Sequence, residues 1–111
     1  MTWDDVVAIA TGLPETEAAT WWGTPGLKVR GKGFGRLRTE AEGALMLFCS
    51  MDEKEALLAS GDPAFFITPH YEKYGAILID LDRVDRDQLT ELITEAWRMK
   101  APPKLQAEFD A

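Results

Sequence analysis

The chain has 111 residues, of which 46% are hydrophobic and 28% are charged, with one cysteine and a formal net charge of −7. This length and composition fit a single soluble globular domain with one modest core. No apolar run approaches the roughly 18–20 residues that cross a bilayer, and the N-terminus carries no secretory signal, so we expect a cytoplasmic protein without a membrane partner.

The first part of the chain predicts one helix and then a strand. Thr2 and Asp5 have the spacing of a capping box, which favours a helix over residues 3–11. Gly12 and Pro14 end this helix, and a short strand is expected over residues 18–22.

A hairpin is expected over residues 27–38, where apolar and basic residues alternate as on a half-buried strand. Gly31-Lys32 fits a two-residue turn with glycine at its first central position. Pairing across that turn would point Arg36 and Arg38 inward. A bulge at Gly35 would turn them outward again.

The second half alternates between apolar strands and capped helices. Strands are expected over residues 44–49, 65–68 and 76–81, and helices over residues 52–60 and 86–100. For 44–49, periodicity alone also allows a buried helical turn. Together these elements predict an α+β two-layer sandwich, an antiparallel sheet with helices on one face. Residues 1–103 should form this single domain, and residues 104–111 a mobile tail.

The basic residues are concentrated in one stretch, residues 21–38, which contains no acid. The rest of the chain holds seven Lys and Arg residues against nineteen Asp and Glu residues. The five cations are Lys28, Arg30, Lys32, Arg36 and Arg38. They predict a local surface for an anionic partner, with phosphate groups of DNA as the leading candidate. The alternative is a solvated edge hairpin whose lysines prevent pairing with other sheets.

No catalytic arrangement is visible in the sequence. His70 has no orienting partner at a recognisable spacing, and Cys49 lies in an apolar run where a thiol is usually inert. One Cys and one His are too few for a zinc site, and the carboxylates around residues 52–55 and 80–87 are explained better as helix caps than as iron ligands. We therefore expect a non-enzymatic protein without metal or cofactor.

A second hypothesis places a ligand groove beside the single histidine. It would be lined by Trp22, Thr24, Pro25, His70 and Tyr71. Such a groove would bind a small molecule or a protein partner, although core packing explains Trp22 alone better, and a structural role in the loop explains His70 better.

Four segments resemble the MmcQ/YjbR family of small bacterial proteins along nearly the whole chain. They are Leu13-Pro14, the block from Trp22 to Lys32 followed by Phe34, the block from Phe66 to Tyr71, and the block from Glu95 to Arg98. The resemblance implies a CyaY-like fold and DNA binding through a proposed double-wing arrangement, although the family has no established biochemical role. Gly33 and Gly35 depart from the bulkier residues usual beside Phe34, which would loosen the hairpin.

The leading hypothesis is thus a binding module that contacts DNA through its basic hairpin. Because the acidic body opposes the approach of phosphates, this binding should be weak and sensitive to salt.

Overall fold

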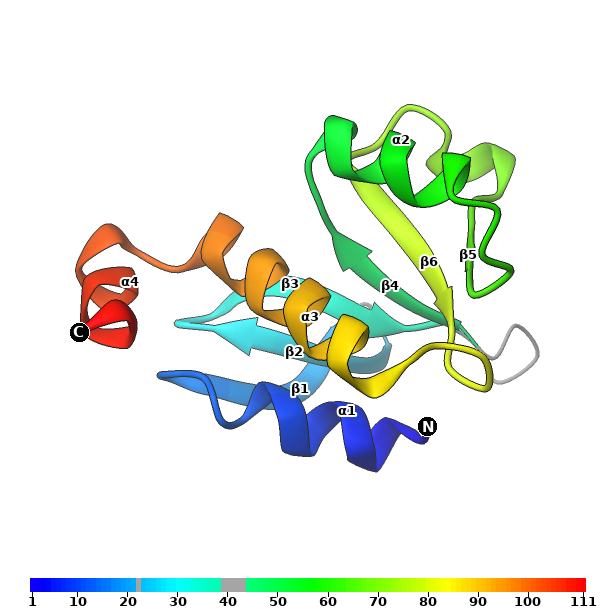
Figure 1. Cartoon of the computed structure of the whole chain (residues 1–111). Helices are drawn as coiled ribbons and strands as arrows, with labels where there is room; N and C mark the ends of the chain where they lie inside the picture. The colour runs from blue at the N-terminus through cyan, green and yellow to red at the C-terminus, as the bar shows by residue number, and fades with distance from the viewer. Residues whose placement is uncertain (22, 39–43) are drawn as a thin grey trace.

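A six-stranded antiparallel sheet of strand order β1-β2-β3-β4-β6-β5 organises the computed structural model, which describes residues 1–21, 23–38 and 44–111 (Figure 1). The strands are β1 (Thr16–Trp21), β2 (Thr24–Val29), β3 (Lys32–Leu37), β4 (Ala44–Phe48), β5 (Phe65–Phe66) and β6 (Ala76–Asp80). The helices are α1 (Trp3–Ala10), α2 (Met51–Ala59), α3 (Arg86–Lys100) and α4 (Pro103–Asp110), with a short 3₁₀ turn, η1 (Pro69–Tyr71). The predicted α+β class is confirmed, and of the segment 44–49 residues 44–48 form a strand.

All four α-helices bury side chains in one core on the same side of the sheet. Val6, Leu57, Ile93 and Leu105, one from each helix, belong to this cluster. Helix α3 contributes most, because its apolar residues recur every three or four positions and so form one continuous stripe. Trp97 ends that stripe fully buried, and its indole N–H donates to the carbonyl of Pro14 at 3.2 Å.

The helix starts follow the capping rules, with one correction. The capping box of Thr2 and Asp5 is present, and Asp85 caps α3 by accepting from the backbone N–H of Gln88. Helix α2 was expected to begin at residue 52 under a carboxylate cap. Instead Ser50 is the cap and accepts from the backbone N–H of Glu53. A serine hydroxyl one turn before the first apolar position satisfies the same orphan donors.

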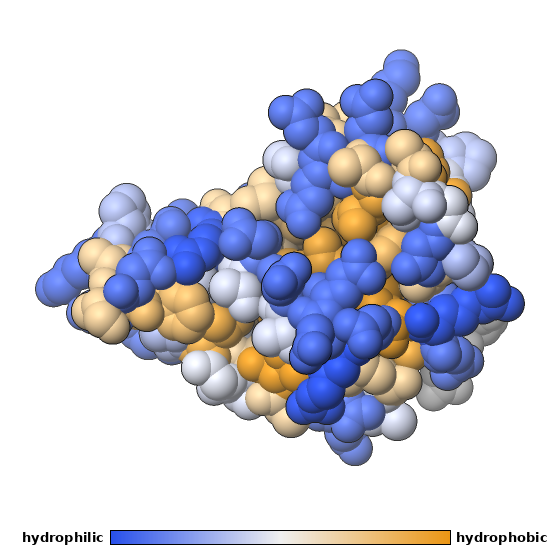
Figure 2. Space-filling model, viewed as in Figure 1, coloured by the Kyte–Doolittle hydropathy of each residue, from blue (hydrophilic) through white to orange (hydrophobic). Residues whose placement is uncertain are grey.

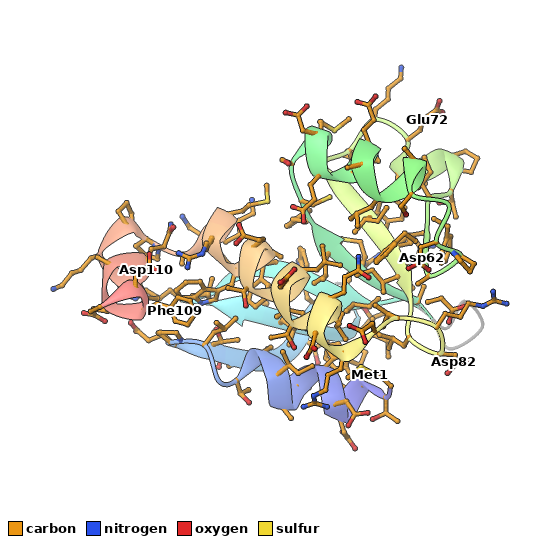
Figure 3. The ribbon with its side chains drawn as sticks, in the orientation of Figure 1. Met1, Asp62, Glu72, Asp82, Phe109 and Asp110 are labelled. Carbon is orange, nitrogen blue, oxygen red and sulfur yellow. The ribbon has the colours of Figure 1, made fainter. Side chains whose placement is uncertain are left out.

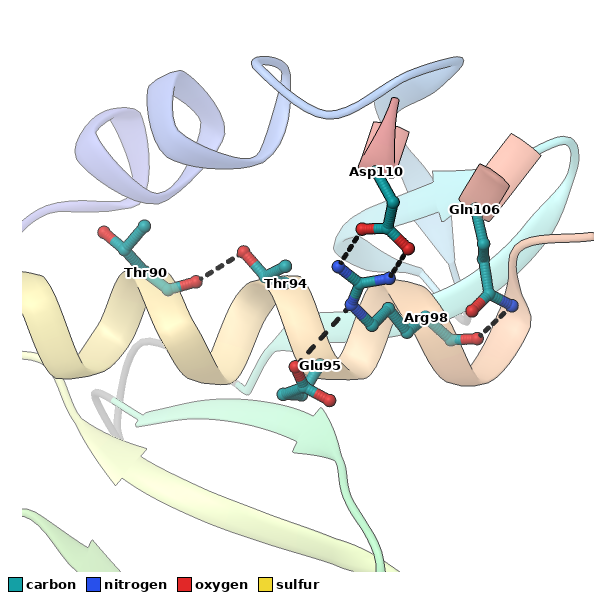
Figure 4. A network of polar contacts seen from close by, with 6 residues as sticks. All are labelled: Thr90, Thr94, Glu95, Arg98, Gln106 and Asp110. Atoms are coloured by element: carbon teal, nitrogen blue, oxygen red, sulfur yellow. Dashed lines mark hydrogen bonds and ion pairs between the residues drawn. The ribbon is translucent and has the colours of Figure 1, made fainter. Parts of the chain in front are cut away.

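Residues 104–111, expected to be a mobile tail, lie almost entirely in helix α4. Arg98 holds this helix by a two-pronged ion pair with Asp110, at 2.7 and 3.0 Å, and Gln106 donates to two carbonyls at the end of α3 (Figure 4). Phe109 packs against Trp97 with ring centroids 5.3 Å apart, and Figure 3 shows Phe109 and Asp110 together at this end of the molecule.

Replacing Trp97 by Ala should lower the free energy of unfolding by about 3–5 kcal/mol, because the change empties a fully buried site and removes the bond to Pro14. Met99→Ala is the control on the same helix. Its side chain is 50% exposed, so we expect a change within about 0.5 kcal/mol. Denaturation followed by circular dichroism measures both, and equal midpoints for the two variants would contradict the docking of α3.

The docking of α4 should weaken in acid. The hydrogen bond from Arg98 lowers the pKa of Asp110 below its ordinary value of 3.8, so the stabilisation is present above pH 3.8 and is lost as the pH falls through the lower, folded pKa. We expect faster hydrogen exchange of the α4 amides in Asp110→Asn at neutral pH. Glu108→Gln, on the same helix, should leave exchange unchanged.

Candidate binding face of the sheet

The face of the sheet opposite the α-helices carries a second, smaller apolar cluster. Its buried members are Met46, Tyr71, Ala76 and Leu78, with Trp21, Phe48 and Phe66 packed around them partly buried. Among the described residues, the segment around η1 contributes Tyr71 to this cluster, and Lys100 at the end of α3 lies over the ring of Phe48. This open face is therefore where side chains of the sheet remain reachable.

The strand register places one residue of every strand in a single row across the sheet. Because directly paired residues share a face, the whole row lies on the open face. The row reads Ala19, Gly26, Arg36, Met46, Leu78 and Phe66. Arg36 thus stands in the middle of the sheet, between a glycine and a buried methionine.

A β-bulge puts Arg36 on this face. Leu27 pairs with Gly35 and Lys28 pairs with Gly33, so Phe34 is the extra residue on β3. Phe34 is buried in the helix-side core, and the residues after it change face relative to a regular strand. The expected bulge therefore exists, one residue before Gly35.

The hairpin turn lies one residue earlier than expected. Val29 pairs with Lys32, which leaves Arg30 and Gly31 as the turn instead of Gly31-Lys32. Both have positive φ, 47° and 80°, the combination of a type I′ turn, which suits the right-handed twist of the paired strands.

Glycines in this hairpin make room for an aromatic ring. A Cβ on Gly33 would lie 2.7 Å from two ring carbons of Trp21, and a Cβ on Gly26 would lie 2.9 Å from the Cβ of Trp21. The indole therefore rests directly on the backbone of β3 at Gly33, and the Cβ of Trp21 lies against β2 at Gly26. The expectation that Gly33 loosens the hairpin overlooked this close packing.

Trp21 forms one side of a groove of about 720 Å³ on the open face, a volume within the usual range for ligand pockets. The groove is lined by Trp21, Arg36, Met46, Phe48, His70, Tyr71, Tyr74 and Ala76. Trp21 meets Phe48 edge to face at 5.9 Å, and His70 lies 4.9 Å from Tyr71 and 5.7 Å from Tyr74. The groove thus combines an apolar floor with aromatic walls and one guanidinium.

The wall formed by His70, Tyr71 and Tyr74 is held by a buried lysine of α2. Lys54 is 3% exposed, and its Nζ donates to the carbonyls of Tyr71, Glu72 and Tyr74 at 2.5–3.2 Å. Sequence reasoning missed this residue. The available signal was its position three residues before Leu57, on the inward face of the helix.

The five predicted phosphate contacts do not form one strip. Arg36 lines the groove, and the guanidinium of Arg38 lies 4.9 Å from the ring centroid of Tyr71. Lys28 shares their face but stands opposite Glu17 in the β1–β2 register. Arg30, in the turn, pairs with Glu15 at 2.7 Å, and its hydrogen bond lowers the pKa of Glu15. Lys32 is exposed at the hairpin end.

The predicted groove is found in part. His70 and Tyr71 line it, whereas Thr24 and Pro25 are not among the lining residues. Trp22 lies outside the described residues. Trp21, the last residue of β1, contributes the indole on this face, because it lies two residues from Ala19 on the same strand.

The helix side offers a different surface, an acidic cleft. Between α2 and α3 lies a hollow of about 410 Å³ bordered by Glu53, Glu91 and Glu95 over Leu57 and Leu92. Figure 2 shows this side, with apolar surface between hydrophilic helices. Burial, and to a lesser degree the charge of Glu95, raises the pKa of Glu53. Within the described ranges, no group of three or more His, Cys, Asp or Glu residues is arranged to hold a metal ion.

The thiol of Cys49 is buried at the edge of the helix-side core. Burial raises its pKa to about 11, so the sulfur is protonated at neutral pH and is a poor nucleophile.

Gly33→Ala should displace the indole of Trp21, because the new methyl group would lie 2.7 Å from the ring. We expect the Trp21 indole N–H resonance to shift and the free energy of unfolding to fall by about 1–3 kcal/mol. The indole resonances of Trp3 and Trp97 serve as internal controls in the same ¹H–¹⁵N spectrum. An unmoved Trp21 signal would contradict the close packing.

Comparison with known proteins gives relatives along the full length of the chain. An uncharacterized protein of Mycobacterium bovis and two of Mycobacterium tuberculosis (strains CDC 1551 and H37Rv) are each 36% identical over 122 aligned positions, covering 97% of this chain and 95% of the relative. The sequence model of the YjbR family matches residues 11–99. A match over most of the chain, together with these relatives, shows that the protein belongs to the YjbR family.

Proposed function

We propose that this protein is a non-enzymatic binding module that contacts nucleic acid with the open face of its sheet. The observation that carries the proposal is the placement of Arg36, Arg38 and Lys28 on one face, beside an aromatic groove. Guanidinium groups bind phosphate oxygens through paired, charge-assisted hydrogen bonds. Aromatic rings next to them supply surfaces on which bases stack.

The distribution of charge between the two sides of the sheet also supports binding on the open face. The four α-helices carry ten of the nineteen acidic residues and five of the twelve basic ones, and all four pack on the other side of the sheet. Because this helix layer is net negative, it repels a polyanion and so favours binding on the open face. With a net charge of −7, the affinity should be in the range of non-specific contacts, about 10⁻⁴–10⁻⁶ M.

A small molecule or a protein segment in the groove is the second candidate. The groove favours it because Met46 and Ala76 form a buried apolar floor under aromatic walls, the usual composition of a ligand pocket. This candidate differs from the first in needing the groove but not Lys28.

We also place the protein in the cytoplasm. The single cysteine, Cys49, is buried and free, as suits a reducing compartment. Among the described residues, no helix is both long and apolar enough to cross a bilayer.

The salt dependence of binding tests the leading function. Each phosphate contact contributes about 0.7–0.9 to the slope of log affinity against log salt concentration. The double variant Lys28→Gln/Arg36→Gln should therefore flatten the slope by at most about 2, as measured by fluorescence anisotropy with labelled oligonucleotides. The control Arg86→Gln/Lys104→Gln removes the same charge from exposed positions on the helices.

Equal changes in both double variants would mean that binding follows net charge and not this face. No binding at low salt would remove nucleic acid from consideration and leave the small molecule or protein segment as the groove's ligand.

A further inference from the structure

We infer that the groove accepts an unpaired nucleobase, with its phosphate on the arginines of β3, so that the ligand is a single-stranded nucleic acid or a free nucleotide and not a duplex. This inference rests on the proposed function and specifies its ligand class. Four observations carry it: the ring arrangement, the recessed apolar floor, the position of the cations and the charge of the body.

The rings around the groove are inclined to one another and are not stacked in parallel. Their pairs meet at interplanar angles of 67° for Trp21 with Phe48, 89° for His70 with Tyr71 and 41° for His70 with Tyr74. Tyr74 is 56% exposed. Arg38 lies over the ring of Tyr71 and Lys100 lies over the ring of Phe48, so the exposed ring of Tyr74 offers the most accessible face to a flat ligand. Stacking on such faces is the common way in which proteins hold unpaired bases.

The floor of the groove is recessed and apolar. Met46 is 4% exposed and Ala76 is 1% exposed, beneath walls formed by Trp21 on one side and the η1 loop on the other. A base in a duplex is covered above and below by its neighbours and shows only its edges in the grooves of the helix. It enters a recess face-on only when it is unpaired.

The cations lie where the phosphate of such a nucleotide would be. Arg36 is part of the groove lining, and Arg38, two residues further along β3, lies over the ring of Tyr71 at 4.9 Å. Both guanidinium groups thus border the aromatic walls directly. Base and phosphate of one nucleotide can be held by adjoining residues.

The acidic body favours a single strand over a duplex. Duplex DNA carries one negative charge per about 1.7 Å of axis, twice the density of one strand. The helix layer behind the sheet holds ten acidic residues, so a second strand adds repulsion. The hairpin places three cations, Lys28, Arg36 and Arg38, on the open face. A second strand would therefore gain few phosphate contacts to offset this repulsion.

The test uses three probes with the full chain: an oligothymidylate of about 12 nucleotides, the same strand annealed to its complement, and thymidine monophosphate. Titration is followed at the indole N–H resonance of Trp21, with Trp3 and Trp97 as internal controls. We expect the single strand to shift the Trp21 signal and to bind more tightly than the duplex. If the monophosphate binds saturably, the site accepts free nucleotides. If the single strand binds and the monophosphate does not, the site is specific for polymers.

The matched variants are Tyr74→Ala and Tyr74→Phe, at a side chain exposed enough to be replaced without unfolding the protein. Loss of one stacked base should weaken single-strand binding about 5- to 150-fold in Tyr74→Ala. Tyr74→Phe keeps the ring and should bind like the unaltered protein.

Two results overturn this inference while leaving the proposed function intact: a duplex that binds as tightly as the single strand, or single-strand binding that leaves Trp21 and both Tyr74 variants unaffected. If no nucleic acid binds at low salt, the proposed function itself fails. Binding of the monophosphate alone would then still support an unpaired base in the groove.

Discussion

Strand β3 has to bury Phe34 among the helices and present Arg36 on the opposite face, although residues two apart on a regular strand share a face. One extra residue resolves this conflict. The bulge at Phe34 lets Phe34 and Gly35 both belong to the helix side, where Gly35 leaves space for Leu47, and it returns Arg36 to the open side. Without it, an arginine would enter the core or a phenylalanine would leave it, and burying an unpaired guanidinium is far more costly than a local break in the ladder.

The consequence is a sheet whose two faces have different chemistry. One face is closed by four helices that carry most of the acidic charge, and it builds the stability of the molecule. The other face receives Tyr71 from the segment around η1, and it keeps aromatic rings and arginines along an open groove. This division lets a protein of net charge −7 keep a local surface suited to anions.

Local signals in the sequence, such as helix caps and apolar periodicity, were enough to predict the helices whose ends and buried faces they determine. The apolar stripe and the Asp85 cap predicted α3 with its observed ends, and the Thr2–Asp5 box predicted α1. The elements that the sequence did not predict depend on packing between residues far apart in the chain. Helix α4 begins at Pro103, directly after the cap residue Pro102, and has a short apolar pattern. Its docking depends on Arg98 and Trp97, which no local rule connects to it.

The candidate site was predictable to the same limited extent. A basic hairpin and the neighbourhood of His70 could be singled out, and a bulge could be anticipated from glycine in a strand. However, the pairing of Arg30 with Glu15 depends on β1 lying beside β2, and the place of Trp21 in the groove depends on which face of β1 lies opposite the helices. The expectation that Gly33 and Gly35 loosen the hairpin arose because a sequence does not reveal which side chains will pack on them, here Trp21 and Leu47.

The anchoring of the groove wall by Lys54 also determines how this wall can recognise a ligand. The carbonyl oxygens of Tyr71, Glu72 and Tyr74 all accept from Lys54 and are therefore turned toward α2. The peptide groups that could read a pattern of donors and acceptors are thus already engaged, and the rings remain. A surface of rings senses flatness and size far more than the identity of the groups at a ligand's edge, so the wall is suited to tolerance among ligands of one shape and not to discrimination between them.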